Sequence, residues 1–122
     1  MSIIINEYKD NIDKCWYNSS NVKYSECNDI ESGLKEVKVV FKDGRTYIYK
    51  GIPVQQYLMF RNSASQGSAL FKYIAVKNKY ETEKLENSDL SLIESEKLMI
   101  IEEREKESKL INQDSLNEEN EK

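Results

Sequence analysis

The chain has 122 residues, enough for one domain with an appended element, and it contains no histidine, the commonest general base and metal ligand. Its two cysteines, Cys15 and Cys27, are too few for a disulfide framework or a zinc site, so we expect free thiols and no bound metal. The net charge of -4 divides unevenly: residues 1–80 carry 12 basic and 8 acidic side chains, whereas residues 81–122 carry 6 and 14, and this acidic part disfavours duplex nucleic acid as a partner.

The chain shows neither a membrane span nor an export signal. It has no run of about 20 apolar residues, which a membrane-spanning helix requires. The start, MSIIINEYKDN, has a short apolar patch without a basic leader or a small-residue cleavage site, so we expect no signal peptide. We therefore expect a cytoplasmic protein.

The first third of the chain predicts a single strand. Residues 1–13 are expected to form a short irregular or edge segment. Residues 16–27, WYNSSNVKYSEC, alternate at Val22 and Tyr24, and this alternation predicts a strand.

The stretch LKEVKVVFKDGRTYIYK, residues 34–50, predicts a hairpin, because Asp43-Gly44 lies between two β-rich runs. A two-residue loop would place the tyrosines on the face of Lys38. A three-residue loop from Lys42 to Gly44 gives glycine the left-handed third position and gathers the large apolar side chains. We predict the three-residue loop, which places these residues on one face: Val37, Val39, Phe41, Tyr47 and Tyr49.

Two short helices are predicted next. Pro53 suits a first helical position, because its φ is fixed and it lacks an N–H. One side of that helix would be formed by Val54, Tyr57, Leu58 and Arg61. Ser65 or Ser68 could cap the following helix, residues 69–80. Its inward stripe would consist of Leu70, Ile74 and Lys77, with Phe71 beside it.

Residues 81–112 are predicted to comprise a linker and a long last helix that begins near Ser88, followed by a disordered end, residues 113–122. At about 3.6 residues per turn, four residues fall within roughly 20° of one another on this helix: Ile93, Ile100, Arg104 and Ile111. Apolar residues outside that stripe predict packing on a partner subunit: Leu92, Leu98, Met99 and Leu110. The predicted fold class is α+β, with a small antiparallel sheet of three or more strands, two short helices and the long C-terminal helix.

Residues 1–80 resemble the KTSC family, small domains named for relatives at the C-terminus of some lysyl-tRNA synthetases. The matching pieces are WYNSSNV, the hairpin LKEVKVVFKDGRTYIYKGIP, Tyr57, and SASQGSALFKYIAVKNKY with its Ser–x–Gly turn and closing tyrosine. In layout the whole chain is most similar to the Thoeris anti-defence sponge proteins of phages and prophages. This resemblance implies a homo-oligomer, in the cytoplasm of an infected bacterial host, that sequesters a cyclic ADP-ribose isomer made by TIR-domain immune enzymes without cleaving it. It also implies that some members hold cyclic oligonucleotides at separate sites.

Arg104 is the first candidate ligand-binding residue. An apolar stripe is normally buried, and a buried guanidinium needs an anion, such as a diphosphate held by two parallel hydrogen bonds. In a helix-mediated dimer, two such stripes would face each other. The alternative is a surface arginine paired with Glu103, Glu107 or a neighbouring chain.

Phe71 is the second candidate, because its ring could stack on an adenine, and such a contact contributes ~1–3 kcal/mol. Phe71 also lies close to an expected helix start, where backbone N–H groups could bind a phosphate. The alternative is a core residue. Weaker candidates are Arg61, Lys72 and Tyr80. Each has an alternative role without a ligand: Arg61 could extend its charged end to solvent over an apolar surface, Lys72 could be solvated, and Tyr80 could be structural.

The sequence shows no catalytic constellation. The carboxylates of the first 80 residues are scattered, and Gly67 alone does not make a phosphate-binding loop. We therefore expect a binding protein without a cofactor rather than an enzyme. The alternative function is a phage-encoded inhibitor that binds a host or defence protein, with the acidic tail mimicking nucleic-acid charge.

Overall fold

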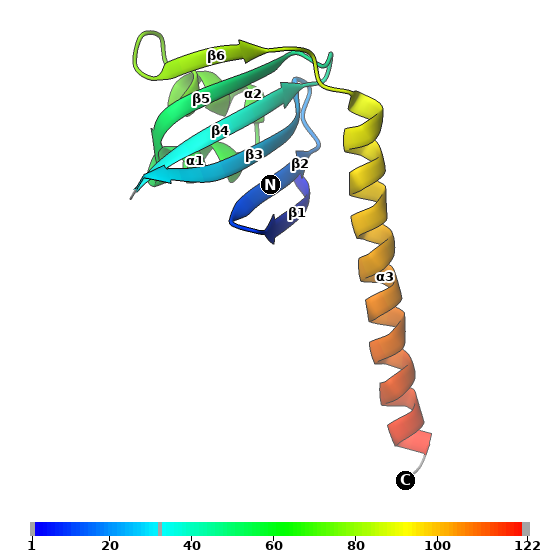
Figure 1. Cartoon of the computed structure of the whole chain (residues 1–122). Coiled ribbons are helices and arrows are strands. Elements are labelled where there is room, and N and C mark those ends of the chain that lie inside the picture. Colours follow the sequence, from blue (N-terminus) through cyan, green and yellow to red (C-terminus); the bar gives the residue numbers. More distant parts are fainter. Residues whose placement is uncertain (1, 32, 121–122) are drawn as a thin grey trace. The chain divides into compact units, whose positions relative to one another are not determined.

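The computed structural model describes residues 2–31 and 33–120, and the side chains of these residues except 30, 31 and 110–120. The chain divides into two compact units, Met1–Leu90 and Ser91–Lys122. The first unit holds an antiparallel sheet and short helical segments, and the second holds most of one long helix (Figure 1). The α+β class predicted from the sequence is confirmed.

In the described part of the chain, the sheet has six strands that follow one another in chain order. All neighbouring pairs are antiparallel. The strands are β1 (Ile3–Lys9), β2 (Ile12–Tyr17), β3 (Val22–Glu31), β4 (Leu34–Phe41), β5 (Thr46–Pro53) and β6 (Glu81–Leu85).

Two strand predictions were wrong, and a third was right in part. Residues 1–13 lie at the edge of the sheet, which is one of the two expected alternatives, but they are regular: β1 is the edge strand, and Asp10 and Asn11, with φ of 54° and 65°, turn it into β2. Short polar side chains tolerate this left-handed region. Residues 16–27 are not one strand, because the chain turns after Tyr17, where the Ser19 hydroxyl accepts a hydrogen bond from the Val22 N–H. The expected link after residue 80 begins instead with β6, which pairs with β5.

The β4–β5 hairpin has the predicted three-residue loop. The Phe41 N–H donates to the Arg45 carbonyl at 2.9 Å, and Gly44 takes a φ of 95°. Val37 pairs with Tyr49, and Val39 pairs with Tyr47. The predicted face is therefore confirmed, and its register was decided by burial of the large apolar side chains.

Helix α1 (Val54–Arg61) starts one residue later than predicted, because Pro53 is still extended, with ψ of 145°. The buried residues of α1 are Tyr57 and Phe60. The four residues predicted to share one side of this helix do so, because they all line one cleft: Val54, Tyr57, Leu58 and Arg61. Leu58 and Val54 are exposed, because the side that carries them borders a cleft rather than the core.

The helical segment predicted for residues 69–80 starts earlier, ends earlier and is partly π-helical. The chain forms α2 (Gln66–Ala69) and then the π-helical turn η1 (Leu70–Ile74), in which the Ala75 N–H donates to the Leu70 carbonyl at 2.7 Å. Ser65 occupies the N-cap position, but its hydroxyl makes no capping hydrogen bond. Leu70 and Ile74 are buried as predicted, whereas Lys77 is exposed, contrary to the prediction.

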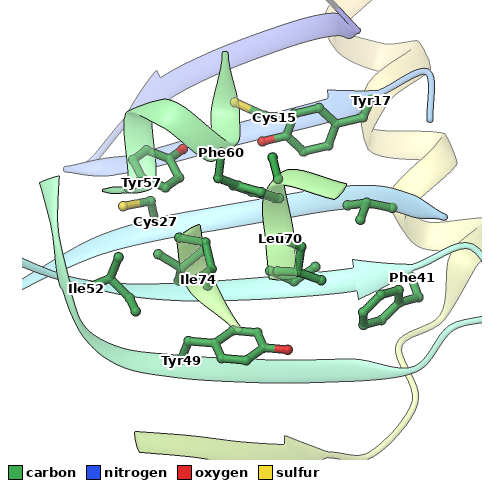
Figure 2. Packing of buried hydrophobic residues seen from close by; sticks show 14 residues of the cluster. Cys15, Tyr17, Cys27, Phe41, Tyr49, Ile52, Tyr57, Phe60, Leu70 and Ile74 are labelled. Atoms are coloured by element: carbon green, nitrogen blue, oxygen red, sulfur yellow. The ribbon is translucent and has the colours of Figure 1, made fainter. Parts of the chain in front are cut away.

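The core lies between one face of the sheet and the segments α1, α2 and η1 (Figure 2). Side chains from β2 to β5 meet Phe60, Leu70 and Ile74 there, and all three are fully buried. Gln66 fixes the end of α1, because its Nε2 donates to the Phe60, Arg61 and Ser63 carbonyls at 3.4, 3.3 and 2.9 Å. The Phe60 and Arg61 carbonyls belong to the last turn of α1, where intrahelical partners run out, and Ser63 follows the helix.

The second unit contains most of α3 (Leu90–Asn120), which starts slightly after the predicted position and continues past residue 112 into the segment expected to be disordered. Leu92, Leu98 and Met99 are exposed, while the side chains of Leu110 and Ile111 lie outside the described residues. Arg104, expected in a buried stripe, is exposed in the single chain. Among the described residues, no helix combines the length and the apolar character needed to cross a membrane.

Candidate functional site

An aromatic groove of about 370 Å³ lies beside β5 in the first unit. We call it the aromatic groove; its lining residues are Phe41, Arg45, Tyr47, Tyr49, Phe71, Ala75, Val76, Lys77, Asn78, Tyr80 and Thr82. A second hollow of about 390 Å³ shares Phe41, Arg45 and Phe71 with it and extends to the loops that contain Asn21 and Lys42. The two hollows therefore adjoin each other.

The sheet positions the aromatic wall of the groove. Tyr47 and Tyr49 stand on the same face of β5, with ring centroids 6.4 Å apart and planes at 28°. Phe41, on the paired strand β4, meets Tyr47 edge to face at 5.9 Å. Burial raises the pKa of Tyr49 to about 12, so its hydroxyl stays protonated at neutral pH and can donate a hydrogen bond.

The opposite wall of the groove comes from η1 and the turn after it. Phe71 follows the buried Leu70 but is 65% exposed, because the side chains of adjacent residues in a helical turn point in different directions. Asn78, with φ of 59°, turns the chain towards Tyr80 and β6. An aromatic side chain exposed at the rim of a groove is available for stacking.

Arg45 supplies a positive charge at the junction of the two hollows. Its guanidinium carbon lies 5.0 Å from the centre of the Phe41 ring, and its Nε lies 2.7 Å from the Asp43 Oδ2. Hydrogen bonds from the backbone and the side chain of Arg45 hold the pKa of Asp43 below its usual range. Both side chains are more than half exposed, so an incoming anion can compete with Asp43 for the guanidinium.

The structure brings Phe71 and Tyr80 together in the aromatic groove. The interpretation of Phe71 as a core residue is wrong, because the ring is mostly exposed. Phe71 also does not start a helix, since α2 precedes it, so the expected phosphate-binding N–H groups are not at this position. Lys72 is exposed, with its Nζ 5.2 Å from the Tyr73 ring centre, and it does not line the groove.

Arg61 and Arg104 lie elsewhere in the chain. Arg61 borders a different cleft, at the end of α1, where it pairs with Asp13. Arg104 belongs to α3, in the second unit.

Arg45 was not predicted as a site residue, and Tyr47 and Tyr49 were predicted to belong to the core alone. The alternation of β5 places Tyr47 and Tyr49 on one face, and Arg45 follows the loop directly. These positions carried the signal, but nothing in the sequence revealed that η1 would leave an open space beside them. Among the described residues, no cluster of three or more acidic or cysteine side chains could hold a metal ion.

The segment that forms most of the aromatic groove is similar to a known domain family. Residues 31–80 match the KTSC domain family. The KTSC match spans β4, β5, α1, α2 and η1, but fewer than half of the 122 residues. It contains Arg45, Phe71 and Tyr80, whereas β6 and α3 lie outside it. No curated protein matches the chain.

Proposed function

We propose that this protein is a phage-encoded anti-defence sponge that binds and sequesters a cyclic ADP-ribose isomer without cleaving it. The observation that carries the proposal is the meeting of Phe71, Tyr80 and the Arg45 guanidinium around one groove. Aromatic faces stack on bases, and a guanidinium matches the geometry of phosphate oxygens. A ligand with an adenine, riboses and a diphosphate offers partners for both.

The dimensions of the site support a small ligand. Pockets of about 300–1,000 Å³ are typical for small molecules, and the aromatic groove of about 370 Å³ falls in that range. The adjoining hollow adds space near Lys42 and Arg45, where phosphates would be attracted. Among the described residues that line these hollows, Asp43 is the carboxylate, so paired acid–base groups do not support an enzyme.

The long helix supports self-association as part of this proposal. Leu92, Leu98 and Met99 are 67%, 56% and 61% exposed, which favours a homodimer or larger homo-oligomer joined through α3. In such an oligomer the Arg104 stripes of two α3 helices would face each other, and Arg104 is proposed to bind a diphosphate there. Arg104→Ala should weaken binding by two or more decades and leave the oligomer intact, as measured by calorimetry and sedimentation.

Isothermal calorimetry with purified cyclic ADP-ribose isomers tests the proposal. Phe71→Ala and Arg45→Gln should each weaken binding at least tenfold, because each removes one of the two recognised groups. Lys72→Ala is the matched control, since Lys72 is exposed on the same helical turn but does not line the groove. Chromatography of the released ligand should show it unchanged.

Two results would overturn the proposal. The first is an absence of heat with every isomer at millimolar concentration. The second is conversion of the ligand during incubation, which would indicate an enzyme.

A protein-binding inhibitor is the second candidate function. The acidic balance of residues 81–122, with 14 acidic and 6 basic side chains, and the exposed apolar residues of α3 favour it. A stoichiometric host protein recovered with the intact chain would support inhibition. A small molecule released on heating would support the sponge.

A further inference from the structure

A separate, more polar cleft of about 240 Å³ lies at the end of α1. We call it the Arg61 cleft; its lining residues are Tyr8, Asn11, Asp13, Cys27, Asp29, Lys35, Val54, Tyr57, Leu58 and Arg61. None of these residues lines the aromatic groove. Any binding at the Arg61 cleft is therefore independent of the proposed function.

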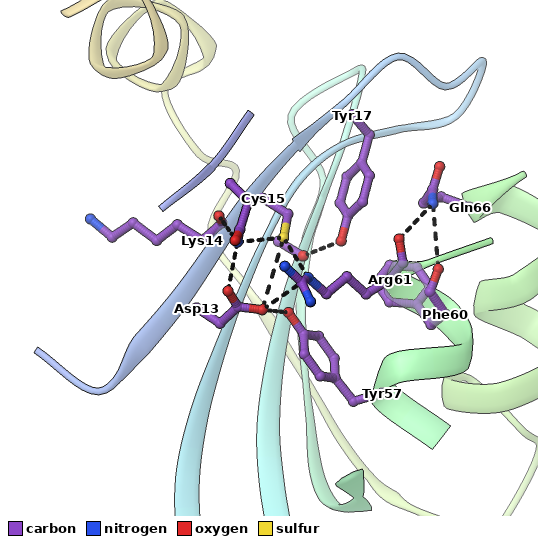
Figure 3. Close-up of polar contacts among 10 residues, drawn as sticks. Asp13, Lys14, Cys15, Tyr17, Tyr57, Phe60, Arg61 and Gln66 are labelled. Atoms are coloured by element: carbon purple, nitrogen blue, oxygen red, sulfur yellow. Dashed lines mark hydrogen bonds and ion pairs between the residues drawn. The ribbon is translucent and has the colours of Figure 1, made fainter. Parts of the chain in front are cut away.

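Asp13 is the anchor behind this cleft (Figure 3). Its Oδ2 accepts a hydrogen bond from the Tyr57 hydroxyl at 2.5 Å and lies 3.2 Å from the Arg61 Nε. Its Oδ1 accepts a hydrogen bond from the Asn6 Nδ2 at 2.6 Å. The Cys15 Sγ also donates to Oδ2 at 3.9 Å. Donors from β1, β2 and α1 thus converge on one part-buried carboxylate, which fixes its position.

Arg61 is held from one side only. Its Nε faces Asp13 and also donates to the Cys15 Sγ at 3.4 Å. In the part of the chain that the structure describes, the side-chain contacts of Arg61 all involve Nε. The two terminal amino groups, Nη1 and Nη2, therefore keep their N–H donors while the side chain lines the cleft.

This arrangement differs from an ordinary ion pair. A guanidinium that faces a carboxylate with both of its forked edges has little left for a ligand, whereas Arg61 uses only its inner nitrogen. Partial burial lowers the pKa of Arg61, but the Cys15 hydrogen bond and the Asp13 charge together outweigh it and raise the pKa. The side chain is thus a charged, preoriented donor at the wall of a cleft.

The rest of the cleft defines what fits beside Arg61. The Lys35 ammonium lies on its rim in an ion pair with Asp29. Val54 and Leu58, at 39% and 38% exposure, form an apolar wall on the neighbouring turns of α1. The charges of the two cations and the two carboxylates of the cleft sum to zero, so the cleft suits one oxyanion group on an apolar body rather than a ligand with several anionic groups.

From this geometry we infer that the Arg61 cleft binds the oxyanion of a small organic ligand, with the Nη groups of Arg61 as the fork. The shared chemistry is a carboxylate or a phosphate monoester, since both present two oxygens at the spacing of a guanidinium. The apolar body lies against Val54 and Leu58. At about 240 Å³, the cleft accommodates one ring or a short branched chain rather than a dinucleotide.

The test is a titration of the full chain, labelled with ¹⁵N at arginine, with benzoate, phenyl phosphate and inorganic phosphate. At least one organic probe should shift the Arg61 Nε–Hε signal saturably at millimolar concentration. Arg61→Gln should weaken this binding at least tenfold, and Arg61→Lys should fall between it and the parent because it keeps the charge but loses the fork. Binding of benzoate alone identifies a carboxylate site, and binding of phenyl phosphate alone identifies a phosphate site.

Leu58→Ser is a second test variant, and Arg45→Gln is the matched control. Leu58→Ser changes an exposed side chain, so the protein should fold even if Arg61→Gln does not, and it should weaken the organic probes more than inorganic phosphate. Arg45→Gln, in the aromatic groove, should change binding of these probes less than twofold.

Three results would overturn the inference. They are an absence of saturable binding by both organic probes, equal binding by folded Arg61→Gln, or equal binding of every probe by Leu58→Ser. A negative result at the Arg61 cleft would not contradict the proposed function of the aromatic groove. An absence of cyclic ADP-ribose binding would likewise not contradict the inference about the Arg61 cleft.

Discussion

Asp13→Asn should destabilise the protein by about 2–3 kcal/mol. The substitution keeps the shape of the side chain but removes the charge that the Arg61 Nε faces at 3.2 Å and the Tyr57 hydroxyl at 2.5 Å. Hydrogen bonds to a charged group contribute about 1.5–3 kcal/mol each, and a buried pair that loses one partner costs about 3–5 kcal/mol. The Asp13 and Arg61 side chains are 15% and 23% exposed, so water screens part of that cost and the lower figure applies.

A double-mutant cycle with Arg61→Gln measures this interaction directly. Removing both charges leaves no unpaired ion, so the double variant should be more stable than the sum of the single losses predicts, by at least about 1 kcal/mol. Urea unfolding at pH 7 gives these values, and the single variant should also melt about 10 °C or more lower. A loss below about 0.5 kcal/mol for Asp13→Asn, or additive single losses, would refute the conclusion that Asp13 anchors Arg61.

Two further substitutions address the loops and the buried thiol. Gly44→Ala should lower the free energy of unfolding by about 1–3 kcal/mol, and by more than the matched control Gly33→Ala does. Both glycines have positive φ. A Cβ at Gly44 would lie 3.3 Å from the Ser88 carbonyl oxygen, whereas a Cβ at Gly33 would meet open space. Equal losses in urea unfolding would contradict this close approach. Burial raises the pKa of Cys27 from 9.0 to about 12, so the unfolded chain ionises first, and this contribution to stability is present below pH 9 and lost as the pH rises to 12. Cys27→Ala should therefore reduce the alkaline decline in unfolding free energy by about 1.4 kcal/mol per pH unit between pH 9 and 11, and an unchanged slope would contradict the burial effect.

The sequence predicted the β4–β5 hairpin well because two local requirements agreed. Gly44 needed the left-handed position, and the burial of Val39 and Phe41 required the same register. The other hairpins carried a weaker form of this signal. Asp10 and Asn11 specify the first one by their left-handed backbone, but their polar neighbours on β1 gave no clear alternation.

Helical segments near residue 70 could not be predicted in detail because tertiary packing decided them. An ordinary helix through residues 69–80 would have carried Phe71 near the core and Lys77 on the inward stripe. The π-turn lengthens the hydrogen-bonded loop at Leu70 and ends the helix at Ile74, so both side chains are exposed.

The candidate site was predicted only in part for the same reason. Phe71 and Tyr80 were both named as candidates, Phe71 from its position near an expected helix start and Tyr80 as the closing tyrosine of the family pattern, and they do share a groove. Arg45 was not named, because its role depends on its position where two hollows adjoin, and only the folded chain forms these hollows. The chemistry of a single residue is visible in the sequence, whereas the space in front of it is not.

The consecutive strand order of the sheet has a consequence for folding kinetics. Most neighbouring strands are joined by only a few residues, so their pairing requires the closure of very short loops. Strand β6 is the exception, since residues 54–80 separate it from β5. For a flexible chain, closing such a loop instead of a three-residue one costs about 2 kcal/mol more entropy. We expect β6 to join the sheet last and to exchange its amide hydrogens first, which ties the formation of the aromatic groove, through Tyr80 and Thr82, to the slowest step of assembly.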